Sequence, residues 1–271
     1  MSARRPERAV HYEVHGKVHG EALSGGTVLL SSGLGGAGAF WAPQLEALCR
    51  RFRVVTYDQR GTGRSAGSLP DPYSITAMAD DVTEILDGLG IARCHFVGHA
   101  LGGLVGLDLA LRRPDRVGSL VLVNAWARGD AHTTRCFDVR RDLLRIGPEA
   151  YIRAQPLFLY PAPWMSHNAQ CLAREHEHAV AHYQGTDTLL RRIAALLAFD
   201  AADRLGEIAC PTLVAAARDD LLVPWTASEA LAAGIPGARL WVAAEGGHGF
   251  TVTEPEAFNA ALCGFLAEQR A

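Results

Sequence analysis

The sequence lacks the features that mark secreted, membrane-spanning or redox-active proteins. No two cysteines have C-x-x-C spacing, and scattered thiols in a chain of this size are typical of proteins kept reduced inside the cell. The N-terminus has no apolar segment of a signal peptide, and no run of 18 apolar residues could form a transmembrane helix. We therefore expect a cytoplasmic protein without a membrane partner. The six cysteines are Cys49, Cys94, Cys136, Cys171, Cys210 and Cys263.

A strongly basic surface is also absent, because 26 Lys and Arg are outweighed by 29 Asp and Glu, for a net charge of −3. This balance argues against a nucleic-acid partner. The short basic cluster of Arg4, Arg5 and Arg8 is interpreted as a solvated tail. Apolar residues make up 49% of the chain, which is enough to bury a large core. The length of 271 residues suits one large α/β domain or two small ones.

What the sequence does contain is an alternation of short β-branched or aromatic runs with segments of helical periodicity. This order predicts a mostly parallel sheet covered by helices on both faces. The predicted strands are His11–His15, Thr27–Ser31, Phe52–Asp58, Cys94–His99, Arg116–Asn124, Pro211–Ala217 and Arg239–Ala243. The predicted helices are Trp41–Arg50, Ile75–Leu89, Leu101–Leu111 and Glu256–Gln269.

Residues 131–199 differ from the rest, because they show helical periodicity, several histidines and a stretch interrupted by prolines. We expect this block to be a helical lid inserted over the carboxyl ends of the strands, where open α/β sheets bind ligands. The predicted division is therefore a core of residues 1–130 and 200–271 with a lid of residues 131–199.

The most informative segment is Gly98-His99-Ala100-Leu101-Gly102, between a predicted strand and a predicted helix. Small residues at its two ends let the chain turn sharply and lift residue 100 above the sheet. Asp220 follows a later strand, and His248 comes after the last one. The chain order of elbow, acid and histidine is that of the α/β-hydrolase fold, in which residue 100 would be the nucleophile. Asp219 could rival Asp220, but Asp220 has the usual spacing of four residues before a proline.

Two backbone amides are predicted to form an oxyanion hole, which stabilises negative charge as it develops. One is the Leu34 amide, in the glycine-rich loop Ser32–Gly36, and the other is the Leu101 amide, after the elbow. The segment Asp58–Ser65 also matches a turn, D-x-R-G-x-G-x-S, that is common in this fold.

Together these motifs resemble RutD, the pyrimidine utilisation protein D family within the α/β-hydrolases, from about residue 27 to the C-terminus. Alanine at the elbow is itself part of that family's pattern. The resemblance implies a role in breaking down the products of uracil ring opening, by hydrolysis of carbamate or of 3-aminoacrylate. The matching stretches are Ser32–Gly36, Tyr57–Gly63, Val97–Gly102, Arg135–Phe137, Gln155–Pro161, Leu189–Arg192 and Asp219–Pro224.

Ala100 limits the chemistry, because a methyl group cannot attack a carbonyl and no acyl-enzyme can form there. His248, oriented by Asp220, could instead deprotonate a water held above the methyl. The predicted activity is hydrolysis of a non-peptide carbon–nitrogen bond. Two alternatives stay open: an inactive fold that binds a partner or metabolite, and a lyase or isomerase that uses His248 alone as acid and base.

Either candidate substrate is a small anion, so the lid should offer cationic groups. Arg135 and Arg140 are candidates, with Arg135 preferred because it lies in a matching stretch, although a solvated helix face would also explain both. Tyr160 and Trp164 are candidates for the apolar underside of the lid, where packing alone would explain them equally well.

No metal or other cofactor is predicted. Three lid histidines, His176, His178 and His182, include a pair at i, i+4 spacing, but no carboxylate or cysteine spacing completes a metal site. His99 is interpreted as a buried structural residue. The sequence leaves the oligomeric state open, with a homodimer among the candidates.

Overall fold

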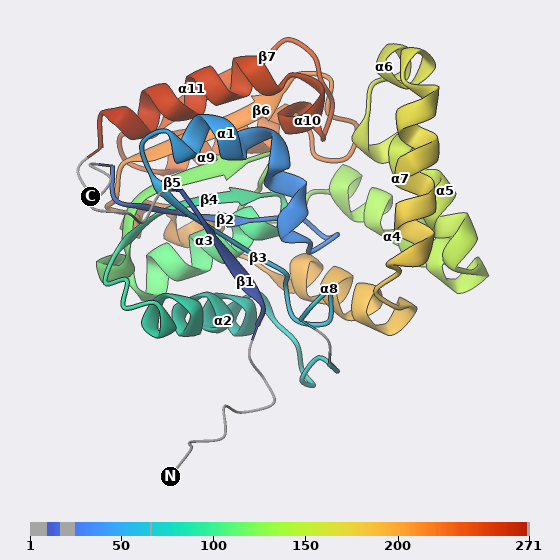
Figure 1. The fold of residues 1–271 in the computed structure, drawn as a ribbon, viewed down its shortest axis with the longest axis horizontal. Helices are drawn as coiled ribbons and strands as arrows, with labels where there is room; N and C mark the ends of the chain where they lie inside the picture. The colour runs from blue at the N-terminus through green and yellow to red at the C-terminus, as the bar shows by residue number, and fades with distance from the viewer. Residues whose placement is uncertain (1–9, 17–24, 66, 270–271) are drawn as a thin grey trace.

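The structure, a computed structural model, describes residues 10–16, 25–65 and 67–269, so that Arg4, Arg5 and Arg8 lie outside the described residues. Its centre is a sheet with the strand order β1-β3-β2-β4-β5-β6-β7 (Figure 1). β1 pairs antiparallel with β3, and all the other neighbours are parallel. The strands are β1 (Tyr12–His15), β2 (Thr27–Ser31), β3 (Arg53–Tyr57), β4 (Cys94–His99), β5 (Val117–Val123), β6 (Thr212–Ala217) and β7 (Arg239–Ala243).

The sequence explains the central strands well. Every residue of β4, β5 and β6 is buried, because helices cover both faces of the sheet there. Strands buried on both sides contain near-continuous apolar runs, as β5 does with the sequence VGSLVLV. The predicted mostly parallel sheet flanked by helices is confirmed.

The helices are α1 (Ala42–Cys49), α2 (Ile75–Gly88), α3 (Leu101–Arg112), α4 (Ala131–Ile146), α5 (Pro148–Leu159), α6 (Ala162–His167), α7 (Ala169–Ala181), α8 (Thr186–Ala198), α9 (Trp225–Gly234), α10 (Phe250–Thr253) and α11 (Pro255–Ala267). Side chains of α1, α10 and α11 join the apolar cluster on one face of the sheet. Those of α2, α3 and α9 join the cluster on the other face. Figure 1 shows the two layers, with α1 and α11 above the sheet and α2 and α3 below it.

Some boundaries differ from the sequence predictions. The predicted helix Trp41–Arg50 starts instead with a 3-10 turn over Gly38–Trp41, and α1 begins only at Ala42. The short helices α9 and α10 were not predicted at all. In α9 the alanine-rich sequence WTASEALAAG has little apolar periodicity, and its only buried residues are Ser228 and Leu231. Its helical state therefore depends on packing against β6 and β7 more than on local pattern.

Helices α4 to α8 follow one another between β5 and β6. In Figure 1, α4 to α7 lie beyond the ends of the central strands, and α8 lies on the same side, lower in the view and closer to the sheet. Helices α4 to α7 thus lie over the edge of the sheet where β4 and β5 end.

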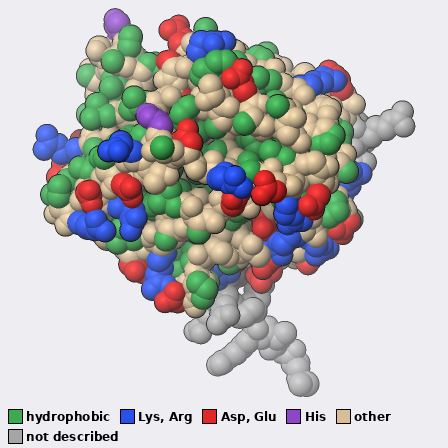
Figure 2. Space-filling view, turned by 180° about the vertical axis from the view of Figure 1, so that it is seen from behind, with side chains coloured by type: hydrophobic (Ala, Val, Ile, Leu, Met, Phe, Trp, Pro, Cys, Tyr) green, Lys and Arg blue, Asp and Glu red, His purple; other side chains and the backbone are tan. Residues whose placement is uncertain are grey.

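None of the helices in the described part of the chain is both long and apolar enough to cross a lipid bilayer. On the face shown in Figure 2, Lys and Arg side chains are interspersed with Asp and Glu side chains and do not gather into one patch. That face therefore offers no extended single-sign field to attract a highly charged polymer.

Candidate active site

The elbow between β4 and α3 holds Ala100 in a conformation that few non-glycine residues adopt, with φ 49° and ψ −113°. Its amide donates to the Val123 carbonyl at 2.8 Å, which fixes the turn to β5. The two flanking glycines are needed for packing, because a Cβ on Gly98 would lie 2.3 Å from the Gly102 carbonyl oxygen. A Cβ on Gly102 would lie 2.2 Å from the Ser31 carbonyl oxygen. The chain thus keeps a tight and strained elbow although residue 100 has no nucleophilic atom.

His248 and Asp220 form a buried pair, with 2.7 Å between His248 Nδ1 and Asp220 Oδ2. The other carboxylate oxygen accepts from the amides of Leu222 at 2.8 Å and Val223 at 3.0 Å, so the acid is held rigidly. An ionised carboxylate can only accept, and the shared proton therefore lies on Nδ1. The lone pair of His248 is left on Nε2, which is the atom that a general base would use.

The loop carrying His248 is held by three further residues. The side chains of His99 and Asn124 donate to the His248 carbonyl oxygen, each at 2.9 Å. Asp219 accepts from the amides of Gly246 and Gly247, at 3.2 and 2.9 Å. Asp219 therefore binds the backbone of this loop, while its neighbour Asp220 binds the imidazole.

His99 contributes as a neutral residue. Burial, with the nearby His248 as a smaller cause, lowers the pKa of His99 to about 3. Because its Nε2 donates to a carbonyl, its Nδ1 carries the lone pair. His99 thus supports the loop without adding a second positive charge beside His248.

Sequence reasoning missed Asn124, which follows β5 and has a positive φ of 47°. An asparagine directly after a buried strand was the available signal, because asparagine tolerates the left-handed region better than most residues.

Both residues whose amides are predicted oxyanion donors, Leu34 and Leu101, line the pocket. Leu101 is the first residue of α3, and the amides of a helix's first turn have no partner within the helix. The Leu101 amide therefore lies at the positive end of the α3 dipole, which favours a nearby negative charge.

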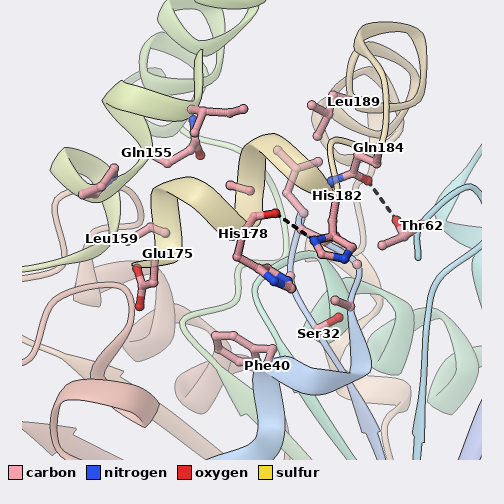
Figure 3. Close-up of a pocket in the computed structure, with 18 of the residues that line it drawn as sticks. Ser32, Phe40, Thr62, Gln155, Leu159, Glu175, His178, His182, Gln184 and Leu189 are labelled. Atoms are coloured by element: carbon pink, nitrogen blue, oxygen red, sulfur yellow. Dashed lines mark hydrogen bonds between the residues drawn. The ribbon is translucent and has the colours of Figure 1, made fainter. Parts of the chain in front are cut away.

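A cavity of about 1290 Å³ opens above the elbow. Ala100, His248 and His99 form part of its floor, and its walls include residues of α4, α5 and α7. Figure 3 shows α7 running across this space, with His178 and His182 on one side of the cavity and Ser32 and Phe40 opposite. The cavity, at about 1290 Å³, is far larger than a molecule of four to six heavy atoms requires.

The two lid arginines have different positions. Arg135 is exposed and does not line the cavity, so the preference for Arg135 over Arg140 finds no support in the packing. Arg140 lines the cavity and is only 4% exposed. It donates to Tyr151 Oη at 3.1 Å and to Gln155 Oε1. The two positions are five residues apart on α4, which places them roughly 140° apart around the helix axis.

Arg140 has no carboxylate partner among the described residues, and its Nε has no hydrogen-bond partner there either. Its guanidinium lies 5.3 to 5.7 Å from the ring centres of Phe137, Tyr151 and Phe158. A buried cation surrounded by aromatic rings and left without an anion is well suited to receive a carboxylate from a ligand.

Tyr160 also lines the cavity, and its hydroxyl donates to the Glu175 carboxylate, 3.1 Å from each oxygen. Trp164 is not part of the cavity wall but packs against Tyr160, with 4.6 Å between ring centres. Burial raises the pKa of Glu175 above its usual value. Of the two aromatic candidates, Tyr160 therefore faces the cavity, whereas Trp164 packs behind Tyr160 and supports it.

Within the described residues, the lid histidines do not form a cluster with other side chains that could hold a metal ion. The rings of His178 and His182 stack at 4.1 Å, and His182 Nδ1 bonds the His178 carbonyl oxygen at 3.0 Å. In the described ranges, no three His, Cys, Asp or Glu residues lie close enough together to hold a metal ion.

Known proteins are similar to this chain in both fold and sequence. A family model described as alpha/beta hydrolase fold matches residues 26–149. The "Putative carbamate hydrolase RutD" of Rhizobium rhizogenes is 56% identical over 258 residues, which cover 95% of this chain and 97% of that protein. The protein of the same name from Variovorax paradoxus is 57% identical over 260 residues, covering 95% and 96%. The crystal structure of an enol-lactonase from Burkholderia xenovorans matches with a TM-score of 0.86 and 31% identity, over 96% of each chain.

Proposed function

The chain belongs to the RutD family of α/β-hydrolase-fold proteins, and we propose that it hydrolyses a small carbon–nitrogen compound by activating water. The observation that carries this proposal is the combination of an intact His248–Asp220 pair with an elbow residue that cannot be a nucleophile. A degraded active site would not be expected to keep the base, the acid and the strained elbow together.

In the proposed reaction His248 Nε2 takes a proton from a water molecule held above the Ala100 methyl. The oxygen of this water attacks the substrate carbon, and negative charge develops on the substrate oxygen or carboxylate. The Leu34 and Leu101 amides stabilise that charge, and His248 returns the proton to the leaving nitrogen. Such general acid–base catalysis contributes about 10²–10⁴-fold.

The two substrates implied by the family fit this scheme with balanced atoms. Carbamate and water give bicarbonate and ammonia. For 3-aminoacrylate, C2 first takes a proton from solvent, which gives an iminium at C3. His248 Nε2 then accepts the proton of the water that adds to C3, and it returns this proton to the carbinolamine nitrogen. Ammonia leaves, the hydroxyl proton returns to solvent, and malonate semialdehyde remains. On this route no oxyanion forms at C3, so the two amides would act on the carbamate route only. Both compounds are labile, so a modest acceleration without a covalent intermediate would suffice.

Arg140 supports an anionic substrate, because its guanidinium lines the same cavity as His248 and lacks a carboxylate partner within the described residues. In 3-aminoacrylate the carboxylate is separate from the carbon that water attacks. One end of the molecule could then bind the guanidinium while the other end faces the base. In carbamate, by contrast, the carbon of the carboxylate is itself the carbon that water attacks.

The test is ammonia release from carbamate and from freshly generated 3-aminoacrylate, with the spontaneous rate subtracted. We expect wild-type protein to accelerate release, and His248→Ala to lose about 10²–10⁴-fold of that acceleration. Asp220→Asn should also lose most of it, because the imidazole would be held in the wrong tautomer.

If His248→Ala were as fast as wild type, the water mechanism would be wrong. If the wild-type protein gave no acceleration with either compound, the alternative of a binding protein without catalysis would be favoured.

A further inference from the structure

Arg192 on α8 is a buried cation that has only uncharged partners. Its side chain is fully buried, and it forms no ion pair with a carboxylate of the described residues. Burial lowers the pKa of Arg192 to about 10, so it still carries its charge at neutral pH. Burying a charge is costly unless hydrogen bonds replace its lost water. The partners of Arg192 therefore indicate what this charge is used for.

The partners lie on two loops of the active site and on the segment before α8. Nη2 donates to the Arg60 carbonyl oxygen and to Thr62 Oγ1, each at 2.7 Å. Nη1 donates to the Leu34 carbonyl oxygen at 3.1 Å and to Gln184 Oε1. Gln184 also accepts from Thr62 at 2.9 Å, a bond drawn at the edge of the pocket in Figure 3.

The loop after β2 makes room for this guanidinium. A Cβ on Gly36 would lie 2.5 Å from Arg192 Nη1 and 2.7 Å from Thr62 Oγ1. Gly36 also has a φ of 74°, which a side chain would strain. The loop and the arginine thus fit each other.

These contacts fix the orientation of the Leu34 amide. The Gly33 carbonyl oxygen accepts from the Gly36 amide at 3.0 Å, and this carbonyl shares a rigid peptide plane with the Leu34 N–H. The next plane carries the Leu34 carbonyl, which Arg192 holds. Both peptide planes around the Leu34 Cα are therefore constrained, one by the loop itself and one by α8.

We infer that Arg192 is a positioning residue of the oxyanion hole, which links the last helix of the inserted block to the direction of the Leu34 N–H. The expected effect of Arg192 on catalysis rests on the proposed function. Its expected effect on the position of the Leu34 loop rests on the hydrogen bonds alone. Arg191 provides the contrast, because it pairs with Asp187 at 2.8 Å and keeps about a third of its side chain exposed.

The test compares Arg192→Lys with the control Arg191→Lys. Lysine keeps the charge but has no planar fork, so it cannot hold Leu34, Arg60 and Thr62 together. In Arg192→Lys we expect the ¹⁵N–¹H NMR signals of Leu34, Gly35 and Gly36 to shift or broaden. We also expect kcat for ammonia release from carbamate to fall about 10- to 100-fold, since losing a whole oxyanion donor costs about 10²–10³-fold. KM should change much less, because the donor acts mainly in the transition state. Arg191→Lys should leave both the signals and kcat as they are in wild type.

A folded Arg192→Lys with unchanged Leu34–Gly36 signals would overturn the inference, whatever its activity. Shifted signals with unchanged kcat would overturn the catalytic part and keep the structural one. Should Arg192→Lys not fold, Arg192→Gln replaces it, because the shorter, neutral amide leaves no unpaired buried charge and cannot reach the Leu34, Arg60 and Thr62 oxygens together. Unchanged loop signals in that variant would equally contradict the inference. If the wild-type protein released no ammonia, only the proposed function would fail, because the NMR comparison needs no substrate.

Discussion

Helices α7 and α8 are consecutive and equal in length, at 13 residues each, yet they bury their side chains differently. Every residue of α7 is described and none is buried, whereas α8 buries Leu189, Arg192, Ile193, Ala195 and Leu196. Several α7 side chains, among them Glu175 and His178, line the cavity. Both helices line the cavity, α8 through Leu189 and Leu196. The difference is that only α8 also packs into the core and holds an active-site loop.

This difference bears on the predicted division of the chain at residues 131 and 199. We propose that the lid ends before α8, near Gln184, and that α8 functions with the core. Removing the whole block would then delete core side chains as well as a wall of the pocket. The protein would lose stability as well as its ligand space.

The largest expected effect is on stability, and it is tested by comparing a truncated side chain of α8 with one of α7. Ile193→Ala should lower the free energy of unfolding by about 2–5 kcal/mol, because it opens a cavity in the core. Val180→Ala on α7 should change it by less than about 0.5 kcal/mol, because Val180 is 49% exposed. Urea unfolding of both variants measures the difference, and equal losses would show that α7 and α8 do not differ in this way.

A smaller effect is expected on substrate binding, from a matched pair on α4. Arg140→Met should lower kcat/KM for ammonia release about 10- to 100-fold, since a charged hydrogen bond contributes about 1.5–3 kcal/mol. Most of the loss should appear as a higher KM. The exposed Arg135 serves as control, and Arg135→Met should match wild type in steady-state kinetics. Comparable losses in both variants would mean that general surface charge, rather than Arg140, attracts the anion.

The smallest effect concerns pH and Glu175 on α7. Burial raises the pKa of this carboxyl, so the folded state binds its proton more tightly than the unfolded chain does. Stability therefore falls as pH rises through the folded pKa, and ionised Glu175 slightly destabilises the fold. Glu175→Gln should be slightly more stable than wild type near neutral pH, and this gain should vanish in acid. Thermal unfolding against pH measures it, with the exposed Glu177→Gln as control. A gain that does not depend on pH would point to packing instead.

Much of this architecture could be predicted from the sequence, because it depends on local pattern. The strands Cys94–His99 and Arg239–Ala243 have the predicted bounds, and the order of elbow, acid and histidine predicted the fold. Ser74 caps α2, since its Oγ accepts from the Ala77 amide at 3.1 Å, and a serine directly before an apolar helical run is a local signal of this kind.

Other features depend on contacts that no local pattern encodes. Which of Arg135 and Arg140 faces the cavity is decided by the rotation of α4 in the fold. The partners of Arg192 on the two loops are 130 to 158 positions away in the chain and are neutral oxygens, so neither spacing nor charge pointed to them. The role of Asn124 likewise depends on a carbonyl 124 residues away.

The central claim, that water attacks because residue 100 cannot, is tested most directly by Ala100→Ser measured with two substrates. The elbow already has the backbone shape in which this fold carries a serine, so the variant should fold and place its Oγ near His248. We predict that the hydroxyl displaces the attacking water, so that ammonia release falls while hydrolysis of p-nitrophenyl acetate rises. A stable variant that keeps full ammonia release and gains no esterase activity would contradict the account.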